Sequence, residues 1–186
     1  MASDVSPAWR SVASQVRLWT VTAAALAADL ISKERVFAWL GWPDQPGPHT
    51  CTVLPNVLEF TTSTNLGAAT GILSGHVSLF VVVGVVALAA FLLFFARSDR
   101  RQWFFHVGIG LVLGGAIGNI YDRLVFGKVR DFIKFTTAID ADWIGGWPRT
   151  GLYPYIFNVA DAALVVGVAA IMLSTLHRAG KTGARG

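Results

Sequence analysis

The sequence predicts an all-α membrane protein with four transmembrane helices, a small β element outside the membrane and an outer amphipathic segment. Two observations carry this prediction. The 186 residues are 54% hydrophobic and only 14% charged, with a mean hydropathy of +0.56, which is too apolar for an ordinary soluble domain. The apolar residues also gather in four runs of roughly 20, the length needed to cross a bilayer. A chain of this length suits a single membrane-embedded domain over residues 1–186.

The first predicted span covers residues 18–40 and is interrupted by charged residues. Asp29 and Lys33 lie four positions apart on one helical face, where opposite charges lower each other's cost near a membrane boundary. A second interpretation is a cleavable secretory signal, because Arg17 precedes an Ala-rich apolar stretch. Apolar residues resume after Arg35 as VFAWLGW, which favours a span.

The other three predicted spans are more uniformly apolar. They cover residues 76–96, 103–125 and 153–176, and the first of these contains no Asp, Glu, Lys or Arg. Between the first two spans, residues 57–64 partly alternate between apolar and polar side chains, which predicts a short strand. After the third span, the segment VRDFIKF at residues 129–135 fits either a strand or a short interfacial helix.

The distribution of basic residues predicts the orientation in the membrane. Lys and Arg precede the first span, fill the link between spans two and three, and follow the fourth span, whereas residues 41–75 contain none. Short loops rich in Lys and Arg stay in the cytoplasm. Both termini are therefore expected there, with residues 178–186 as a disordered tail. The link at 126–152 carries basic residues and fits the rule less well, although acidic residues are interspersed in it.

Composition and motifs argue against several classes of function. The net charge of +4 comes from short basic clusters between apolar runs, without a phosphate loop or a basic stripe, so nucleic-acid binding is not expected. The single cysteine, Cys51, allows no internal disulfide. No HExxH zinc motif or GxSxG elbow is present, and the histidines do not cluster in the sequence. Neither a metal nor another cofactor is expected.

Asp161 lies in apolar sequence, where a carboxylate is costly and is therefore a candidate for function. Apolar residues follow it along most of the fourth span, so solvation does not explain it. A structural hydrogen bond to Asn119 or Asn158 explains it as well as chemistry does. These amides are expected to be hydrogen-bond partners between helices rather than reactants.

Two further carboxylates are Asp122, near the end of the third span, and Asp131, which follows that span. Asp122 stands next to Arg123, and an ion pair that ends a helix is its expected role. Spacing alone favours Asp131 as a solvated surface group, because Arg130 and Lys134 flank it. Two carboxylates about 3 Å apart cannot both ionise easily, so one keeps its proton. Such a pair can hydrolyse a peptide, since one member takes a proton from water and the other donates to the leaving nitrogen.

Two other classes of function stay open on the residues alone. In a proton-coupled transporter, the aspartates together with Asp29 and Lys33 would form a proton relay. Four spans without inverted repeats make a transporter less attractive. The third class is a membrane scaffold without enzymatic activity. The run from Asn65 to Gly67 also suggests a binding role, because small residues let a backbone approach a ligand closely.

Four segments together resemble the bacterial lipoprotein signal peptidase family, signal peptidase II. They are DLISK at 29–33, TNLGAA at 64–69, GGAIGNIYDRLVFGKVRDFI at 114–133 and FNVADAAL at 157–164. The combination of GNxxDR and FNxAD in this order is the specific part of the resemblance. The sequence departs from the family pattern at Arg130, where an aliphatic residue is common, and at Thr70, where an aromatic residue is common. The link between Asp131 and Asp161 is also longer than is usual in the family.

The resemblance implies an aspartic endopeptidase of the bacterial cytoplasmic (inner) membrane, with its active site toward the outer face. The catalytic pair maps onto Asp131 and Asp161. The implied substrate is a prolipoprotein whose cysteine already carries diacylglycerol, and cleavage just before that cysteine releases the signal peptide. Membrane lipids are the other partners, and a monomer is expected. The residues that match substrate-binding or supporting positions of the family are Asp29, Lys33, Asn65, Gly67, Asn119, Asp122, Arg123, Asn158 and Ala160.

Overall fold

The computed structural model describes residues 6–67, 77–136 and 155–183. The chain divides into two compact units, and each is described by itself. Unit 1 comprises Met1–Asp29, Ser78–Tyr121 and Val159–Gly186, and unit 2 comprises Leu30–Val77 and Asp122–Asn158. Some helices given below therefore have residues in both units.

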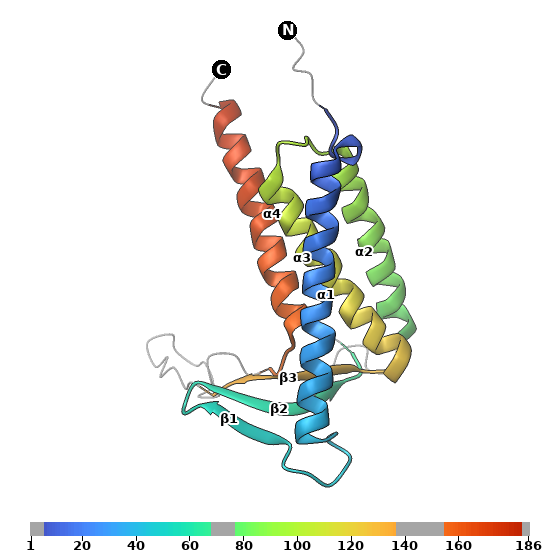
Figure 1. Ribbon diagram of the computed structural model, residues 1–186, viewed down its shortest axis with the longest axis vertical. Coiled ribbons are helices and arrows are strands. Elements are labelled where there is room, and N and C mark those ends of the chain that lie inside the picture. The colour runs from blue at the N-terminus through green and yellow to red at the C-terminus, as the bar shows by residue number, and fades with distance from the viewer. Residues whose placement is uncertain (1–5, 68–76, 137–154, 184–186) are drawn as a thin grey trace. The chain divides into compact units, whose positions relative to one another are not determined.

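Long helices build unit 1. Within the described residues they are α1 (Val12–Leu40), α2 (Val77–Arg97), α3 (Trp103–Phe126) and α4 (Val159–Gly183). Figure 1 shows α2, α3 and α4 running side by side with the first part of α1. In the part of the chain that the structure describes, three helical segments are long and apolar enough to cross a membrane, namely α2, α3 and residues Val159–Ala179 of α4. The four expected helices are thus present, while a fourth membrane crossing by α1 stays a prediction.

The predicted spans at 76–96 and 103–125 match α2 and α3 to within one residue, whereas α1 begins at Val12, earlier than the expected residue 18, and α4 begins later than expected. The fourth span was expected to begin at residue 153, whereas α4 begins at Val159. The reason is that Phe157 forms an isolated antiparallel bridge with Ile133, which keeps the preceding chain out of the helix. Asp161 consequently lies in the first turn of α4, whereas a helix from residue 153 would place it about two turns from the start. At its other end, α4 extends to Gly183, within the segment expected to be a disordered tail.

Small residues let the helices of unit 1 pack closely. A Cβ atom added at Gly114 of α3 would lie only 2.7 Å from the Cβ of Ala25 on α1. A Cβ added at Gly115 would collide with the carbonyl oxygen of Ala160 on α4. These two glycines therefore have a packing role, because only a residue without a side chain allows the backbones to come this close.

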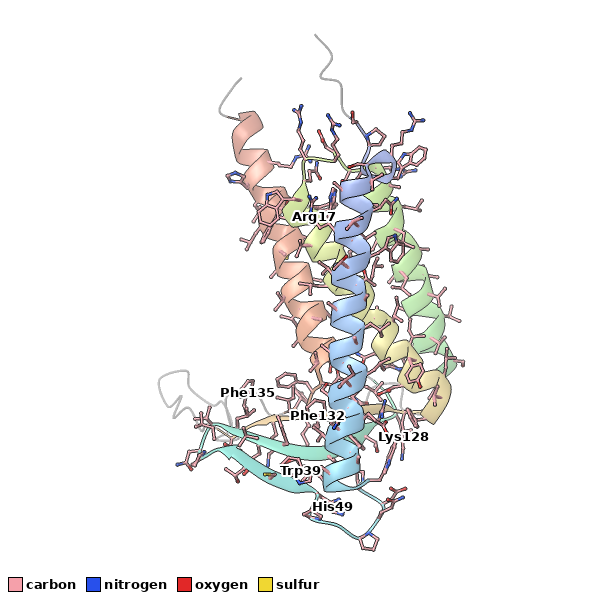
Figure 2. All side chains as sticks on the ribbon, in the orientation of Figure 1. Arg17, Trp39, His49, Lys128, Phe132 and Phe135 are labelled. Atoms are coloured by element: carbon pink, nitrogen blue, oxygen red, sulfur yellow. The ribbon has the colours of Figure 1, made fainter. Side chains whose placement is uncertain are left out.

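A buried polar contact closes one end of unit 1. Nη1 of Arg17 (Figure 2) lies 3.3 Å from Nδ1 of His106, and the Oγ atom of Ser98 lies 2.9 Å from Nε2 of the same ring. The backbone N–H of Ala8 donates to the carbonyl oxygen of Ser98 at 2.8 Å. These contacts tie the start of the chain to the link between α2 and α3.

A three-stranded antiparallel sheet in the order β1–β2–β3 organises unit 2. The strands are β1 (Thr50–Leu54), β2 (Leu58–Asn65) and β3 (Val129–Phe135). The strand predicted at 57–64 is β2. The segment VRDFIKF is β3, so the alternative of an interfacial helix is wrong. It is extended because β2 supplies a pairing partner along it, from Leu58 opposite Phe135 to Asn65 opposite Val129.

Aromatic packing covers the sheet of unit 2. Phe132 of β3 (Figure 2) is buried, and its ring centroid lies 5.5 Å from that of Phe60 in an edge-to-face contact. Phe135 packs against Phe157 at the same centroid distance of 5.5 Å. These contacts fix β3 and the residues just before α4, which carry the site described next. Ala68, Ala69, Thr70 and the long link at 137–154 lie outside the described residues.

Candidate active site

In unit 1, polar side chains gather around the first turn of α4. Nδ2 of Asn119 on α3 donates a hydrogen bond of 2.8 Å to Oδ1 of Asp161. Asn119 is buried, and Asp161 is half-buried. The N-terminal end of a helix carries unpaired N–H groups and the positive end of the helix dipole, which suits an anionic side chain there. One amide and one helix terminus therefore fix the position of Asp161.

Asp29 of α1 caps the same helix from a neighbouring one. Its side chain is fully buried, and Oδ1 accepts a 2.9 Å hydrogen bond from the backbone N–H of Ala160. Ala160 is the second residue of α4, so this N–H has no acceptor within its own helix. Ala160 is also fully buried. The two expected site residues thus act together to hold the start of α4.

Gly118 makes room for Asp29, and this gives a testable prediction. A Cβ atom added at Gly118 would collide with Oδ2 of Asp29. We expect Gly118→Ala to displace the carboxylate, uncap α4 and lower the free energy of unfolding by about 1–3 kcal/mol, as overpacking does. Thermal unfolding in detergent, followed by tryptophan fluorescence, measures the loss.

Gly84→Ala on α2 is the matched control. An added Cβ there meets Cδ1 of Ile120, the flexible end of a side chain, at 2.8 Å. Both substitutions gain the same helix propensity, up to about 1 kcal/mol. The difference between them therefore isolates the collision at Asp29. Equal stability of the two variants would contradict the role given to Gly118.

In unit 2, Asp131 of β3 is held by Asn158. Nδ2 of Asn158 donates to Oδ1 of Asp131 at 2.7 Å and reaches the carbonyl oxygen of Arg130 at 3.3 Å. Asp131 is only 4% exposed, so the expectation of a solvated surface carboxylate is wrong. The reason is that the first four residues of β3 are all buried, which charged neighbours in the sequence do not reveal.

Backbone hydrogen bonds join the two motifs that carry Asp131 and Asn158. The N–H groups of Phe132 and Ile133 both donate to the carbonyl oxygen of Phe157, at 3.0 and 2.8 Å. The N–H of Phe157 donates back to Ile133 at 3.0 Å. The register of Asn158 against Asp131 is therefore set by the main chain, not only by the two side chains.

Asp122 lies at the centre of a buried charge cluster in unit 2. Its Oδ2 lies 3.2 Å from Nζ of Lys33. Its Oδ1 accepts from Nη2 of Arg130 at 2.8 Å and from Nε at 3.2 Å, and its Oδ2 accepts from the backbone N–H of Arg130 at 2.9 Å. All three residues are at most 2% exposed. A buried carboxylate of this kind needs such partners, because an isolated buried charge is very costly.

Arg130 is the site residue that sequence reasoning missed. The sequence offered Arg123 as the partner of Asp122, whereas the structure brings Lys33 and Arg130 to it. The guanidinium of Arg130 also lies 4.3 Å from the ring centroid of Phe126. One feature of the sequence pointed to Arg130: it stands where an aliphatic residue is common in the family that the chain resembles.

Arg123 holds the loop that follows β2. Its Nη2 donates to the carbonyl oxygen of Gly67 at 3.3 Å. The backbone N–H of Gly67 donates in turn to Oδ1 of Asn65 at 2.9 Å. Hydrogen bonds therefore connect Asn65, Gly67 and Arg123 at the end of β2.

The expected site residues fall into two groups, one in each unit. Unit 1 holds Asp29, Asn119, Ala160 and Asp161, and unit 2 holds Lys33, Asn65, Gly67, Asp122, Arg123, Asp131 and Asn158. Each catalytic candidate receives an amide N–H on its Oδ1 atom, from Asn119 or from Asn158. Across the described ranges, no three His, Cys, Asp or Glu side chains are arranged to hold a metal ion.

Comparison with known proteins identifies the family of the chain. The family model of signal peptidase (SPase) II matches residues 21–177. A lipoprotein signal peptidase of Staphylococcus haemolyticus (strain JCSC1435) is 38% identical over 130 residues, which cover 68% of this chain and 73% of that protein. One of Desulfitobacterium hafniense (strain DSM 10664 / DCB-2) is 34% identical over 124 residues, covering 67% of this chain and 72% of that protein.

Solved structures agree with the sequence comparison. A bacterial membrane enzyme determined by the in meso method at 2.3 Å resolution superposes with a TM-score of 0.69 at 29% identity, over 87% of this chain and 88% of that one. A second such structure, at 1.9 Å resolution, gives a TM-score of 0.66 at 31% identity, over 84% of this chain and 90% of that one. The family model spans most of the sequence, and the chain therefore belongs to the signal peptidase II family, the family of the lipoprotein signal peptidases.

Proposed function

We propose that this protein is an aspartic endopeptidase that removes signal peptides from prolipoproteins carrying a diacylglyceryl-modified cysteine. Membership of the signal peptidase II family makes it a protease with apolar, membrane-type helices. The proposal adds the mechanism and the substrate. The observation that supports it best is that Asp131 and Asp161 are each oriented by one asparagine amide, at 2.7 and 2.8 Å.

Covalent connectivity supports the pairing of these two aspartates. Asn158, which donates to Asp131, precedes Asp161 by three residues. Three residues of extended chain span at most about 11 Å. The covalent chain therefore allows both carboxylates to address one scissile bond.

The proposed chemistry uses a single proton shared by the pair. The ionised carboxylate takes a proton from a water molecule, whose oxygen attacks the scissile carbonyl carbon. The protonated carboxylate polarises the carbonyl oxygen and later donates its proton to the leaving nitrogen. Such a pair titrates as a unit, so neither residue is assigned the acid or the base at rest. Asn119 and Asn158 keep the two Oδ1 atoms in place during these transfers.

The proposed setting is the bacterial cytoplasmic membrane, with both termini in the cytoplasm, the active site toward the outer face and the protein acting as a monomer. Basic residues at both ends of the chain and between α2 and α3 support this orientation. We include α1 as the fourth span. Two of its charged residues, Asp29 and Lys33, are fully buried within the protein and do not face lipid, whereas Glu34 and Arg35, closer to its end, are exposed.

The test is cleavage of a lipidated precursor by the purified protein in liposomes. We expect rapid cleavage before the diacylglyceryl cysteine, and none of the same precursor with serine at that position. Equal cleavage of both precursors would contradict the proposed substrate. A pH-sensitive dye inside the liposomes examines the transporter alternative, which predicts that the pH gradient collapses while the precursor stays intact.

A further inference from the structure

A groove of about 780 Å³ opens at one end of unit 1, between the start of α3 and the last turns of α4. Much of its lining is apolar and comes from Trp103 and Phe104 on α3 and from Leu173 and Leu176 on α4. Trp103 is 60% exposed and Leu176 is 65% exposed. Both helices are apolar enough to cross a membrane, so exposed side chains of this kind are suited to contact lipid acyl chains.

Basic side chains line the same groove. They are Arg101, just before α3, and His177 and Arg178, near the end of α4, and all three are exposed. No Asp or Glu occurs among the described residues that line it. Figure 2 shows further nitrogen-bearing side chains at this end of unit 1, near Arg17.

A neighbouring pocket extends the positive charge. Arg178 lines it too, together with Arg97. The acidic residue there is Asp99, whose Oδ1 accepts a 2.9 Å hydrogen bond from the backbone N–H of Arg101. Cationic side chains beside an apolar lining match a molecule that has both a phosphate group and an acyl chain, because arginine pairs well with phosphate oxygens.

We propose that this groove binds one anionic phospholipid, with the headgroup phosphate at Arg101 and Arg178 and an acyl chain along the apolar lining. Trp103 suits this position, since tryptophan is enriched at membrane–water interfaces. The groove is separate from the candidate active site, because Arg178 lies 17 residues beyond Asp161 on α4, or about 25 Å at 1.5 Å per residue. The inference depends on unit 1 spanning a bilayer and does not depend on the proposed peptidase mechanism.

Native mass spectrometry of the full-length protein in detergent tests the site, with phosphatidylglycerol and phosphatidylcholine of identical acyl chains. We expect the protein to retain one phosphatidylglycerol and to release phosphatidylcholine. The double variant Arg101→Gln/Arg178→Gln should bind phosphatidylglycerol about 30-fold more weakly, given the usual contribution of two arginines at a lipid surface. Ser174→Trp keeps every charge but fills the groove, and should also lose the bound lipid.

The matched control is Arg10→Gln/Arg100→Gln. It removes the same charge from two exposed arginines that do not line the groove, and should leave binding within about twofold of wild type. Equal retention of the two lipids, or equal loss in the control, would overturn the proposal. Displacement of the lipid by millimolar inorganic phosphate would also overturn it, because it would indicate a site for a soluble anion. Thermal unfolding of every variant confirms that the protein is folded.

Discussion

Replacing either Asp131 or Asp161 by asparagine is expected to abolish cleavage of the lipidated precursor while the protein stays folded in the membrane. Asparagine has the shape of aspartate and keeps an oxygen to accept the N–H of Asn158 or Asn119, so the hydrogen bonds at 2.7 and 2.8 Å can persist. It cannot take up or release the proton that hydrolysis requires. Because one carboxylate serves as base and the other as acid, each loss should lower kcat by at least about 10³-fold.

Two further measurements distinguish the loss of a catalytic group from a general loss of folded protein. The double variant should be no slower than either single one, because residues that act as a unit are not additive. Asp44→Asn and Asp99→Asn are matched controls outside the two polar groups, and both should cleave at the wild-type rate. Cleavage at the wild-type rate by Asp131→Asn or Asp161→Asn would exclude that residue from the catalytic pair. A melting temperature near that of wild type excludes unfolding as the cause of lost activity.

Much of the helical fold could be predicted because each helix carries its own signal. The segment that forms α2 is apolar throughout, and α3 is apolar over a length that crosses a bilayer. The start of α4 could not be placed in this way. It depends on Phe157 pairing with Ile133, a contact between distant parts of the chain that no local pattern encodes.

The candidate site was predictable in its members but not in its contacts. Motif spacing marked Asn119, Asn158 and Asp161, and the structure connects Asn119 with Asp161 and Asn158 with Asp131. The burial of Asp131 follows from its place in a strand whose first four residues are all buried. Neighbouring charges in the sequence suggested the opposite, because they do not show which side chains a sheet covers.

The charge cluster around Asp122 shows the same limit. Lys33 and Arg130 lie far from each other in the sequence, and both reach one carboxylate. Asp122 and Arg123 are neighbours in the sequence, so they are readily considered as a pair. Helical spacing cannot predict that β3 returns beside the end of α3 and brings Arg130 to Asp122. Arg130 reaches Asp122 because Gly127 has a φ of +69°, a backbone conformation that turns the chain sharply between α3 and β3.

Asp122→Asn is expected to be the most destabilising single change in this cluster. It removes the negative charge that lies between Lys33 and Arg130, and leaves these two buried cations facing a neutral amide. Removing one partner of a buried ion pair costs about 3–5 kcal/mol. In a chain of this size, each kcal/mol corresponds to about 2–4 °C of melting temperature. Thermal unfolding in detergent should therefore show a drop of roughly 10 °C.

Glu34→Gln is the control that separates buried from exposed pairing on the same arginine. Arg130 contacts Glu34 at 3.2 Å and Asp122 at 2.8 Å, but the Glu34 side chain is 75% exposed whereas that of Asp122 is fully buried. Water already stabilises an exposed carboxylate, so its loss should cost less than about 1 kcal/mol. If Asp122→Asn and Glu34→Gln lowered the free energy of unfolding equally, the burial of the Asp122 ion pairs would make no difference to stability. A large loss in Asp122→Asn alone would show that Arg130, the residue that departs from the family pattern, is held in place chiefly by Asp122.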